Sequence, residues 1–340
     1  MAALRIAILT PDLDERKGGI ERFCSELFRS LRAKHEVFLV EPGLMRIPKL
    51  IRIFGLDNLW KTLAASRELR KLNPDLLITN RDMGVVFMST PRIHVIHGTM
   101  VAQKLADKGG RPMRDWLFRG VFIGGLLEFL SCLGASRVCV SQSCKYEVQK
   151  WYRLSVEAVI PNGVDFDPAC SSLDSRLRAL LFVGRPESRK GYEAAKEIAG
   201  ELGVPLRAAG VVSDVGVVGL GILDYLSLQR EYRTVFGMLL PSKHEACSYA
   251  ILEALASGCL VFTTRVGWVC ELLKGVPEYQ QFTVELGQEQ MLGSIISNTF
   301  ANQAQATHIL TEARDWMKKE VTLEIFSERW NKLIDEFLTV

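Results

Sequence analysis

Short apolar runs alternate along this chain with longer segments in which apolar residues recur every three or four positions. The first run, residues 4–9, ends at Thr10-Pro11-Asp12, and apolar residues then follow at helical spacing from Ile20 to Leu31. Further short runs lie at residues 37–40, 76–79, 94–97 and 137–140. Fully apolar runs separated by helical segments are typical of parallel strands buried on both faces. The pattern therefore predicts an α/β fold.

The same alternation restarts after residues 160–163. New apolar runs lie at residues 179–183, 206–209, 235–240 and 260–264. A boundary is expected at residues 161–168, where Pro161, Gly163 and Pro168 interrupt any continuing element. The 340 residues suit two domains better than one core, so we predict two doubly wound parallel sheets facing a cleft. Periodicity also predicts a helical tail over residues 312–340.

Composition excludes several classes of protein. Hydrophobic residues make up 48% of the chain and charged residues 24%, without low-complexity tracts, so the whole chain is expected to fold. Its eight cysteines form neither a Cys-x-x-Cys pair nor a metal-ligand spacing, which favours reduced thiols, no bound metal and a cytoplasmic location. We expect no signal peptide, and the most apolar stretch, residues 121–135, is short and contains Glu128.

Charge is distributed unevenly along the chain. Residues 1–160 contain 25 basic and 16 acidic residues, whereas residues 161–340 contain 17 and 23. Basic and apolar residues mix in residues 44–72 and again in residues 111–119, a pattern that fits helices lying at the inner face of a membrane. It equally fits the solvent faces of ordinary amphipathic helices, so both interpretations stand. Without a zinc pattern, an RNA-binding motif or a dense basic run, no nucleic-acid partner is expected.

Three polar loops follow predicted strands, where doubly wound sheets bind ligands. The first, residues 11–19, ends in Gly18-Gly19, which suits either close approach to a ligand or a plain tight turn. The second, residues 184–191, contains Arg185 and Lys190, a pair suited to a diphosphate unless the loop is merely solvated. No Gly-x-Gly-x-x-Gly motif opens a helix, which argues against a nicotinamide or flavin enzyme.

The third loop leads into a helix expected to begin near Cys247 or Ser248. Glu245 then lies just before the helix and Glu253 about two turns inside it, so the two carboxylates would reach different parts of an extended ligand. Free amides around Ala246 would suit a phosphate. Alternatively, Glu245 only complements the helix dipole and Glu253 is a solvated helix residue. Because Glu253 is flanked by apolar residues, we expect its charge to have a partner.

Taken in order, these segments resemble the retaining glycosyltransferases of family 4, which have the GT-B fold of two Rossmann-like domains. The resemblance runs nearly end to end and lies in the motifs Gly18–Arg22, His97-Gly98, Val140–Ser143, Ile160–Asp165, Val183–Arg185 with Lys190-Gly191, and Pro241-Ser242 before a Glu, seven residues, Glu motif. It implies an N-terminal acceptor domain of residues 1–163 with about 327–340, and a donor domain of residues 164–326.

The resemblance also implies roles for individual residues. Arg185 and Lys190 match the basic pair that holds the donor diphosphate, Glu245 matches the carboxylate that contacts the transferred sugar, and Glu253 matches the one that binds the donor ribose. Ala246 and Cys247 would offer amides to the sugar or phosphate. His97 matches a histidine that contacts the donor sugar, and Gly18 and Gly19 match the glycine loop near the diphosphate. Asn162 is the remaining implied substrate-binding residue. No cofactor or metal is expected.

The implied activity is transfer of a hexose, with retention, from UDP or GDP to a hydroxyl of a glycan or lipid-linked acceptor, in polysaccharide or lipopolysaccharide synthesis. The sequence favours neither a monomer nor a dimer. Two departures from the family pattern stand out: Ala246-Cys247 replace a glycine and an aromatic residue or Leu, and Trp268 follows a single glycine, where it would crowd the donor pocket or change its sugar preference. They motivate the alternative of a catalytically impaired partner subunit that binds a nucleotide sugar.

Overall fold

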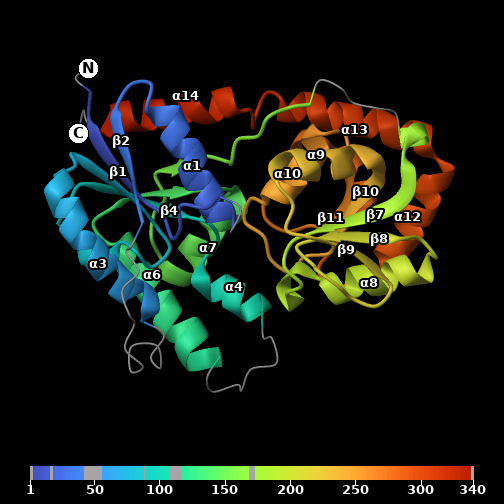
Figure 1. Ribbon diagram of the computed structural model, residues 1–340, viewed down its shortest axis with the longest axis horizontal. Helices are drawn as coiled ribbons and strands as arrows, with labels where there is room; N and C mark the ends of the chain where they lie inside the picture. The colour runs from blue at the N-terminus through green and yellow to red at the C-terminus, as the bar shows by residue number, and fades with distance from the viewer. Residues whose placement is uncertain are drawn as a thin grey trace. The chain divides into compact units, whose positions relative to one another are not determined.

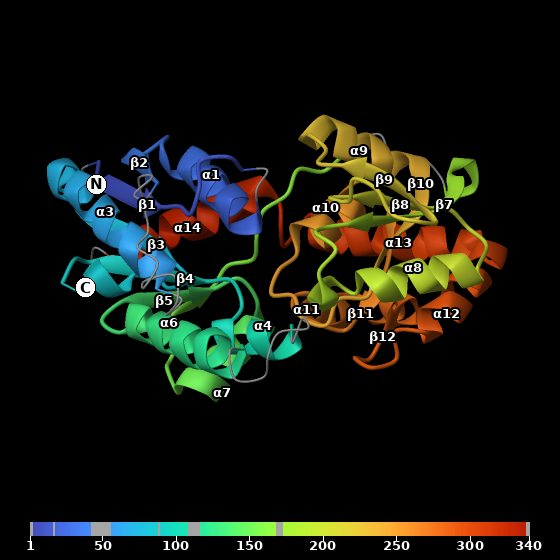
Figure 2. The same cartoon turned by 60° about the horizontal axis from the view of Figure 1, so that its bottom comes forward.

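The computed structural model describes residues 3–15, 18–41, 56–87, 89–107, 116–167 and 173–337. The chain divides into two compact units, the first formed by Met1–Gly163 with Leu323–Val340 and the second by Val164–Thr322. Each unit contains one six-stranded sheet in which all neighbouring strands are parallel (Figures 1 and 2). The predicted α/β class with two doubly wound sheets is therefore confirmed.

The sheet of the first unit has the strand order β2-β1-β3-β4-β5-β6. Its central strands are apolar and buried on both faces, as β3 illustrates with five buried residues in succession. In chain order the strands are β1 (Arg5–Leu9), β2 (Glu36–Val40), β3 (Leu76–Asn80), β4 (Arg92–Ile96), β5 (Ser136–Cys139) and β6 (Ala158–Val159).

Helices cover this sheet, and the last of them comes from the C-terminal end of the chain. In Figure 1, α14 (red) lies beside α1 (blue), where Phe23 packs edge-on against Phe326 and Trp330. In chain order the helical segments of this unit are α1 (Gly19–Leu31), α3 (Asp57–Leu72), the short 3-10 helix η1 (Val85–Phe87), α4 (Met100–Ala106), the π-helix η2 (Trp116–Ile123), α6 (Gly124–Cys132), α7 (Gln142–Tyr152) and α14 (Leu323–Phe337).

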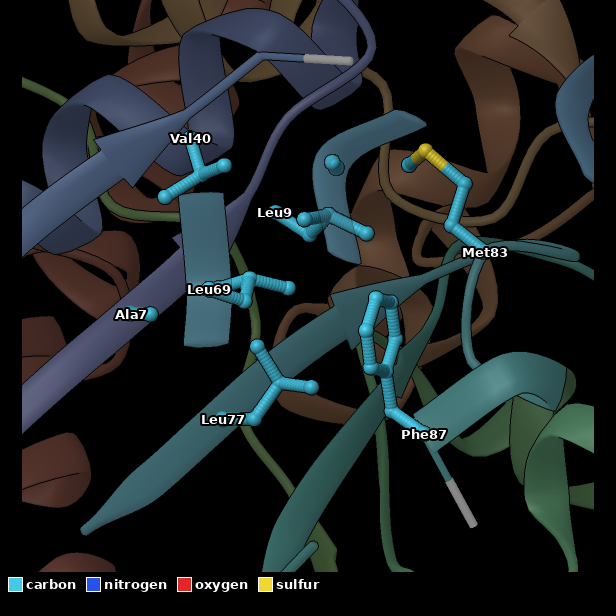
Figure 3. Packing of buried hydrophobic residues seen from close by; sticks show 8 residues of the cluster. Ala7, Leu9, Val40, Leu69, Leu77, Met83 and Phe87 are labelled. Carbon is cyan, nitrogen blue, oxygen red and sulfur yellow. The ribbon is translucent and has the colours of Figure 1, made fainter. Parts of the chain in front are cut away.

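A compact apolar cluster joins this sheet to α3 (Figure 3). Leu9 and Leu77 project from neighbouring strands toward Leu69 of α3, and Phe87 and Met83 close the cluster beyond the end of β3. Burial of such side chains stabilises the folded state by roughly 1.5–3 kcal/mol each. The cluster thereby fixes the carboxyl ends of β1 and β3, from which the polar loops of this unit emerge.

The sheet of the second unit has the strand order β12-β11-β10-β7-β8-β9. Its strands are β7 (Leu177–Val183), β8 (Leu206–Ala209), β9 (Val217–Gly221), β10 (Val235–Leu240), β11 (Leu260–Thr264) and β12 (Thr283–Val284). The helices that accompany it are η3 (Leu173–Ser175), η4 (Ser188–Lys190), α8 (Tyr192–Glu201), α9 (Tyr225–Thr234), α10 (Tyr249–Ala256), α11 (Val269–Gly275), η5 (Pro277–Phe282), α12 (Met291–Ala301) and α13 (Gln303–Met317).

The predicted continuous helical tail is wrong in one respect. Residues 318–322 separate α13 from α14: the chain turns at residues 318–320, and Val321 and Thr322 then pair with the segment that leaves the first unit. Val164 donates its backbone N–H to the carbonyl of Val321 at 2.9 Å and forms a β-bridge with Thr322. This contact joins residues about 157 positions apart, so helical periodicity does not reveal it.

Candidate functional site

Strand order in the second unit reverses between β7 and β10. The chain passes from β7 outward to β8 and β9, and then returns to place β10 on the opposite side of β7. The loops that follow β7 and β10, residues 184–191 and 241–248, therefore leave the same edge of the sheet side by side. Such a reversal is where doubly wound sheets bind ligands, because the two loops diverge there.

Two glycines shape the first of these loops. Gly184 and Gly191 have positive φ values of 145° and 71°, which residues with a side chain rarely adopt. A Cβ atom on Gly191 would lie 2.0 Å from the carbonyl oxygen of Pro241, so the loops approach closely only because position 191 is glycine. The backbone N–H of Lys243 then donates to the carbonyl of Arg189 at 2.7 Å. The two loops thus form one rigid surface.

Lys190 and Glu245, two of the predicted site residues, meet on this surface. The Lys190 Nζ lies 2.6 Å from the Glu245 Oε1, and the Ser242 hydroxyl donates to the same oxygen at 2.9 Å. The Glu245 side chain is 8% exposed and that of Lys190 is 17% exposed. Their pairing joins residues 55 positions apart at the point where the strand order reverses.

Glu245 stays ionised despite its burial. Burial alone would raise the pKa of this carboxyl, but the charges of Lys190 and Arg189 and the hydrogen bonds from Lys190 and Ser242 outweigh it and hold the pKa below its ordinary value. The free energy that the ionised form contributes to folding is complete above the ordinary pKa and is lost as pH falls through the lowered one. At neutral pH the site therefore contains a buried, paired carboxylate.

Arg189 is a member of this site that the sequence analysis missed. Its Nη1 donates to the carbonyl of His244 at 3.0 Å and lies 3.8 Å from the Glu245 Oε1, while its Nη2 lies 3.3 Å from the Glu187 Oε2. Arg189 thus ties the two loops together beside Lys190. The signal was present in the sequence as two consecutive basic residues, but nothing local indicates that the arginine turns toward the second loop.

The predicted basic pair is divided between two carboxylates. Arg185 pairs with Glu187 at 3.2 Å and its side chain is 74% exposed, whereas Lys190 pairs with Glu245. Because exposed ion pairs contribute at most about 1 kcal/mol, little free energy holds the Arg185 guanidinium in place. The ion pair between Arg185 and Glu187 is therefore weak, and another anion can replace Glu187 as the partner of the guanidinium.

The second carboxylate of the motif lies inside α10. This helix begins at Tyr249, after the N-cap residue Ser248, one residue beyond the predicted start. Glu253 is 3% exposed, and the hydroxyl of the buried Tyr232 donates to its Oε2 at 3.2 Å. The expectation that this charge has a partner in its apolar surroundings is confirmed. Its contact with a ribose stays a prediction.

Ala246 and Cys247, both buried, connect Glu245 to this helix. The backbone of Glu245 and Ala246 lies against Gly267, which has a φ of 59° and whose Cβ would lie 2.4 Å from the carbonyl oxygen of Glu245. Trp268 donates its N–H to the carbonyl of Ala246 at 2.8 Å. Its indole is 3% exposed and packs 5.7 Å from the ring of Trp316 in α13. The bulk of Trp268 is thus accommodated within the helix packing of the second unit.

The first unit has its own reversal of strand order, between β1 and β3. Here Asn80, at the end of β3, donates its amide to the carbonyl of Leu9 at 3.0 Å, so its Oδ1 accepts a hydrogen bond of 2.9 Å from His97 Nε2. Burial, and next the charge of Arg81, lower the pKa of His97 to about 3. His97 is therefore neutral at physiological pH and suits hydrogen bonding rather than proton donation.

The other predicted residues of the first unit lie at the ends of its elements. Gly18 precedes α1 in extended conformation, and Gly19 is the first residue of this helix. The carboxylate of Glu21 lies 2.6 Å from the position of a Cβ on Gly18, so space rather than backbone conformation favours glycine there. Asn162 is buried beyond β6. The roles of Gly18, Gly19 and Asn162 stay predictions.

The loop that carries His97 is fixed by two carboxylates, of which Glu128 is buried. Glu128 of α6 accepts hydrogen bonds from the Met100 N–H at 2.7 Å and from the Tyr152 hydroxyl at 2.5 Å, and Glu147 of α7 accepts from the N–H and hydroxyl of Thr99. Burial raises the pKa of Glu128 to about 7, although these hydrogen bonds oppose the shift. The start of α4 is thus tied to two neighbouring helices.

This raised pKa predicts a pH-dependent contribution to stability. Between the ordinary pKa of 4.5 and about 7, folded chains hold a proton on Glu128 that unfolded chains release, so this contribution falls as pH rises through that window. Relative to wild type, the unfolding free energy of Glu128→Gln should therefore increase by roughly 3 kcal/mol between pH 4.5 and 8. Denaturant unfolding at several pH values measures this difference. Glu147→Gln is the control, and an equal pH trend in both variants would contradict the prediction.

Metal-ligand groups are not found among the described residues, where no cluster of three or more His, Cys, Asp or Glu side chains lies in position to hold an ion. In the same part of the chain, no helix is long and apolar enough to cross a bilayer. Residues 108–115, which include part of a segment predicted to fit a membrane surface, lie outside the described residues.

Comparisons with known proteins found similarity to one family model and to solved structures. The family model of Glycosyltransferase Family 4 matches residues 17–168. Among solved structures, the chain is similar to sucrose-phosphate synthase of Thermosynechococcus elongatus, with 17% identity, a TM-score of 0.78 and 99% of each chain covered. A glycosyltransferase of Rickettsia africae matches with 17% identity, a TM-score of 0.69 and 99% of each chain covered.

HepE of Anabaena, solved in complex with UDP and glucose, matches with 14% identity, a TM-score of 0.70 and coverage of 98% of this chain and 99% of that one. No protein of curated function matches the chain in sequence. At these identities the solved structures show the fold alone, and the family model matches slightly less than half of the chain. The chain therefore has the GT-B fold, and its residues 17–168 resemble Glycosyltransferase Family 4.

Proposed function

We propose that the chain transfers a hexose, with retention of configuration, from a nucleoside diphosphate sugar to a hydroxyl of a glycan or lipid-linked acceptor. The observation that carries the proposal is the pair of the half-buried Lys190 and the buried Glu245, which lies where the strand order reverses between β7 and β10. A cation beside an oriented carboxylate suits a diphosphate that is joined to a sugar, because one end of the ligand is anionic and the other offers hydroxyl groups.

Arg185 and Lys190 would bind the diphosphate, with phosphate oxygens displacing Glu187 from the exposed Arg185 guanidinium. Glu245 would accept hydrogen bonds from sugar hydroxyls, with the amides of Ala246 and Cys247 beside it, and Glu253 would accept from the ribose. In the first unit, His97, Gly18, Gly19 and Asn162 would contact the sugar, diphosphate or acceptor. Fixed cations of this kind act on charge that grows as the nucleotide leaves, without cofactor or metal.

In the proposed reaction the bond between the sugar C1 and the phosphate oxygen breaks, and the acceptor oxygen bonds to C1 on the same face. The leaving phosphate oxygen accepts the proton of the acceptor hydroxyl, so no proton is left over. The residues of the chain hold the acceptor hydroxyl and the leaving phosphate on the same face of the sugar and stabilise the departing negative charge. We place this reaction in the synthesis of a cell-surface polysaccharide or lipopolysaccharide, at the cytoplasmic face of the membrane.

Thermal unfolding with UDP, GDP, ADP and their sugar conjugates tests the proposal, because a ligand that binds only the folded state raises the unfolding midpoint. UDP and UDP-glucose are the first probes, since HepE of Anabaena was solved with UDP and glucose. One nucleotide diphosphate should raise the midpoint of the wild type. Lack of response to all three would refute the donor assignment, whereas binding without transfer to any acceptor would favour the impaired partner subunit.

Glu253→Gln gives a second readout on the same site. If Glu253 binds the ribose, the variant should need about tenfold more nucleotide for the same rise in midpoint, which corresponds to the loss of a hydrogen bond to a charged group. Tyr232→Phe removes the partner hydroxyl of Glu253 without removing the carboxylate, and it should bind the nucleotide nearly as the wild type does. Equal nucleotide affinity in Glu253→Gln and wild type would make Glu253 a structural residue.

A further inference from the structure

The carboxylate of Glu187 lies between two arginines of the loop after β7. Its Oε1 is 3.2 Å from the Arg185 Nε, and its Oε2 is 3.3 Å from the Arg189 Nη2. The backbone of Glu187 is fixed, because its carbonyl accepts from the Lys190 N–H at 2.9 Å and its N–H donates to the Arg185 carbonyl at 2.7 Å. The Glu187 side chain can therefore change partners while the loop keeps its shape.

The two arginines differ in how firmly they are held. The Arg189 side chain is 17% exposed, donates to the His244 carbonyl at 3.0 Å and lies 3.8 Å from the Glu245 Oε1. The Arg185 side chain, in contrast, is 74% exposed. Because an exposed guanidinium loses little free energy when it exchanges one anion for another, the contact of Glu187 with Arg185 breaks more readily than its contact with Arg189. A Glu187 carboxylate displaced from Arg185 would thus stay with Arg189.

The charges of the two loops oppose an incoming anion as well as attract it. Three cationic side chains, Arg185, Arg189 and Lys190, are paired with two carboxylates, Glu187 and Glu245. A diphosphate that binds Arg185 brings further negative charge close to the Glu187 carboxylate, and like charges a few ångströms apart repel each other. Glu187 therefore acts against such a ligand in two ways, since it occupies the guanidinium and repels the anion.

We propose that Glu187 is an internal competitor of the donor diphosphate, which limits the affinity of the site and returns to Arg185 when the nucleoside diphosphate leaves. Fixed cations alone would retain this product, and product release limits turnover in many enzymes. A carboxylate that takes the place of the departing anion lowers the free-energy cost of that release. This inference rests on the proposed function, but its test requires neither the sugar nor the acceptor.

Isothermal titration of the full chain with inorganic pyrophosphate, in buffer with a chelator, measures the affinity for the charged group alone. Glu187→Gln keeps the size of the side chain but removes its charge, and it should bind pyrophosphate about three- to fivefold more tightly than the wild type, the range that one exposed ion pair allows. The matched control is Glu193→Gln, which removes an exposed carboxylate from the first turn of α8. Its pyrophosphate affinity should differ from that of the wild type by less than about twofold.

A double-mutant cycle shows whether Glu187 acts through Arg185. In the Arg185→Ala background, the change Glu187→Gln should tighten pyrophosphate binding less than about twofold, because no guanidinium remains for the carboxylate to occupy. The same gain in both backgrounds would show that Glu187 repels the anion without competing for Arg185, and the proposal would be wrong. Thermal unfolding without ligand verifies that each variant is folded.

The outcomes separate this inference from the proposed function. If the wild type binds pyrophosphate and Glu187→Gln binds it equally or more weakly, Glu187 only positions the two arginines, and the proposal is overturned while the donor assignment stands. If the wild type binds neither pyrophosphate nor any nucleoside diphosphate, the proposed function fails and this inference fails with it. Tighter binding in Glu187→Gln that depends on Arg185 is the result expected here.

Discussion

Lys190→Ala is expected to lower the turnover of sugar transfer by about two to three orders of magnitude, the usual effect of removing one group that stabilises charge in a transition state. Its ammonium is held 2.6 Å from Glu245 and lies on the loop after β7, so it is already oriented before the donor binds. The effect should fall mainly on turnover, because the negative charge on the phosphate grows as the nucleotide leaves.

The matched control is Lys243→Ala. Lys243 is an exposed lysine of the facing loop whose Nζ lies 3.4 Å from the Ser188 hydroxyl, and its removal should change turnover less than about threefold. Steady-state rates over a range of donor concentrations measure both variants. Equal turnover in Lys190→Ala and wild type would show that the lysine only balances the charge of Glu245.

The stability of the same variant provides an internal test of the ion pair. Without Lys190, the buried Glu245 keeps Arg189, at 3.8 Å, and Ser242 as partners, so the unfolding free energy should fall by about 1–3 kcal/mol. The double change Lys190→Ala with Glu245→Gln removes the buried charge as well and should restore part of this loss. A lack of coupling between the two substitutions in thermal unfolding would contradict the geometry of the pair.

The arrangement of strands was largely predictable from the sequence, because buried parallel strands are apolar throughout. All nine predicted strands are present. The three strands that were not predicted are β6 and β12, which contain only two residues each, and β9, which lies at the edge of its sheet and contains two glycines. Short and edge strands bury little surface, so they leave little signal in the sequence. Hydrophobic periodicity detects buried side chains, whereas β6, β9 and β12 are recognised by the hydrogen bonds of their backbone.

The site was predictable as a set of positions but not as a set of contacts. Sequence order places Lys190 and Glu245 after strands, yet only the reversal between β7 and β10 brings them together. The division of Arg185 and Arg189 around Glu187 depends on side-chain directions that spacing does not determine. The sequence also does not show why residues 191 and 267 must be glycine, because the carbonyl groups that leave no room for a Cβ there belong to other loops.

Gly191→Ala is expected to destabilise the second unit more than any other glycine-to-alanine substitution there. The new Cβ would lie 2.0 Å from the Pro241 carbonyl oxygen and 2.7 Å from its carbon, and both are backbone atoms that cannot rotate away. The loops after β7 and β10 would have to separate, which weakens the Lys190–Glu245 contact. We expect a loss of at least about 3 kcal/mol in unfolding free energy, combining this overlap with the cost of a positive φ.

Gly203→Ala separates these two contributions. Gly203 has a φ of 63°, close to the 71° of Gly191, but a Cβ there would meet no atom within 4 Å. Its substitution should cost only the conformational strain, about 1 kcal/mol. Denaturant unfolding of both variants gives the difference, which measures how tightly the two loops are pressed together. If the two losses were equal, the loops would yield easily, and the rigid surface inferred for Lys190 and Glu245 would have to be abandoned.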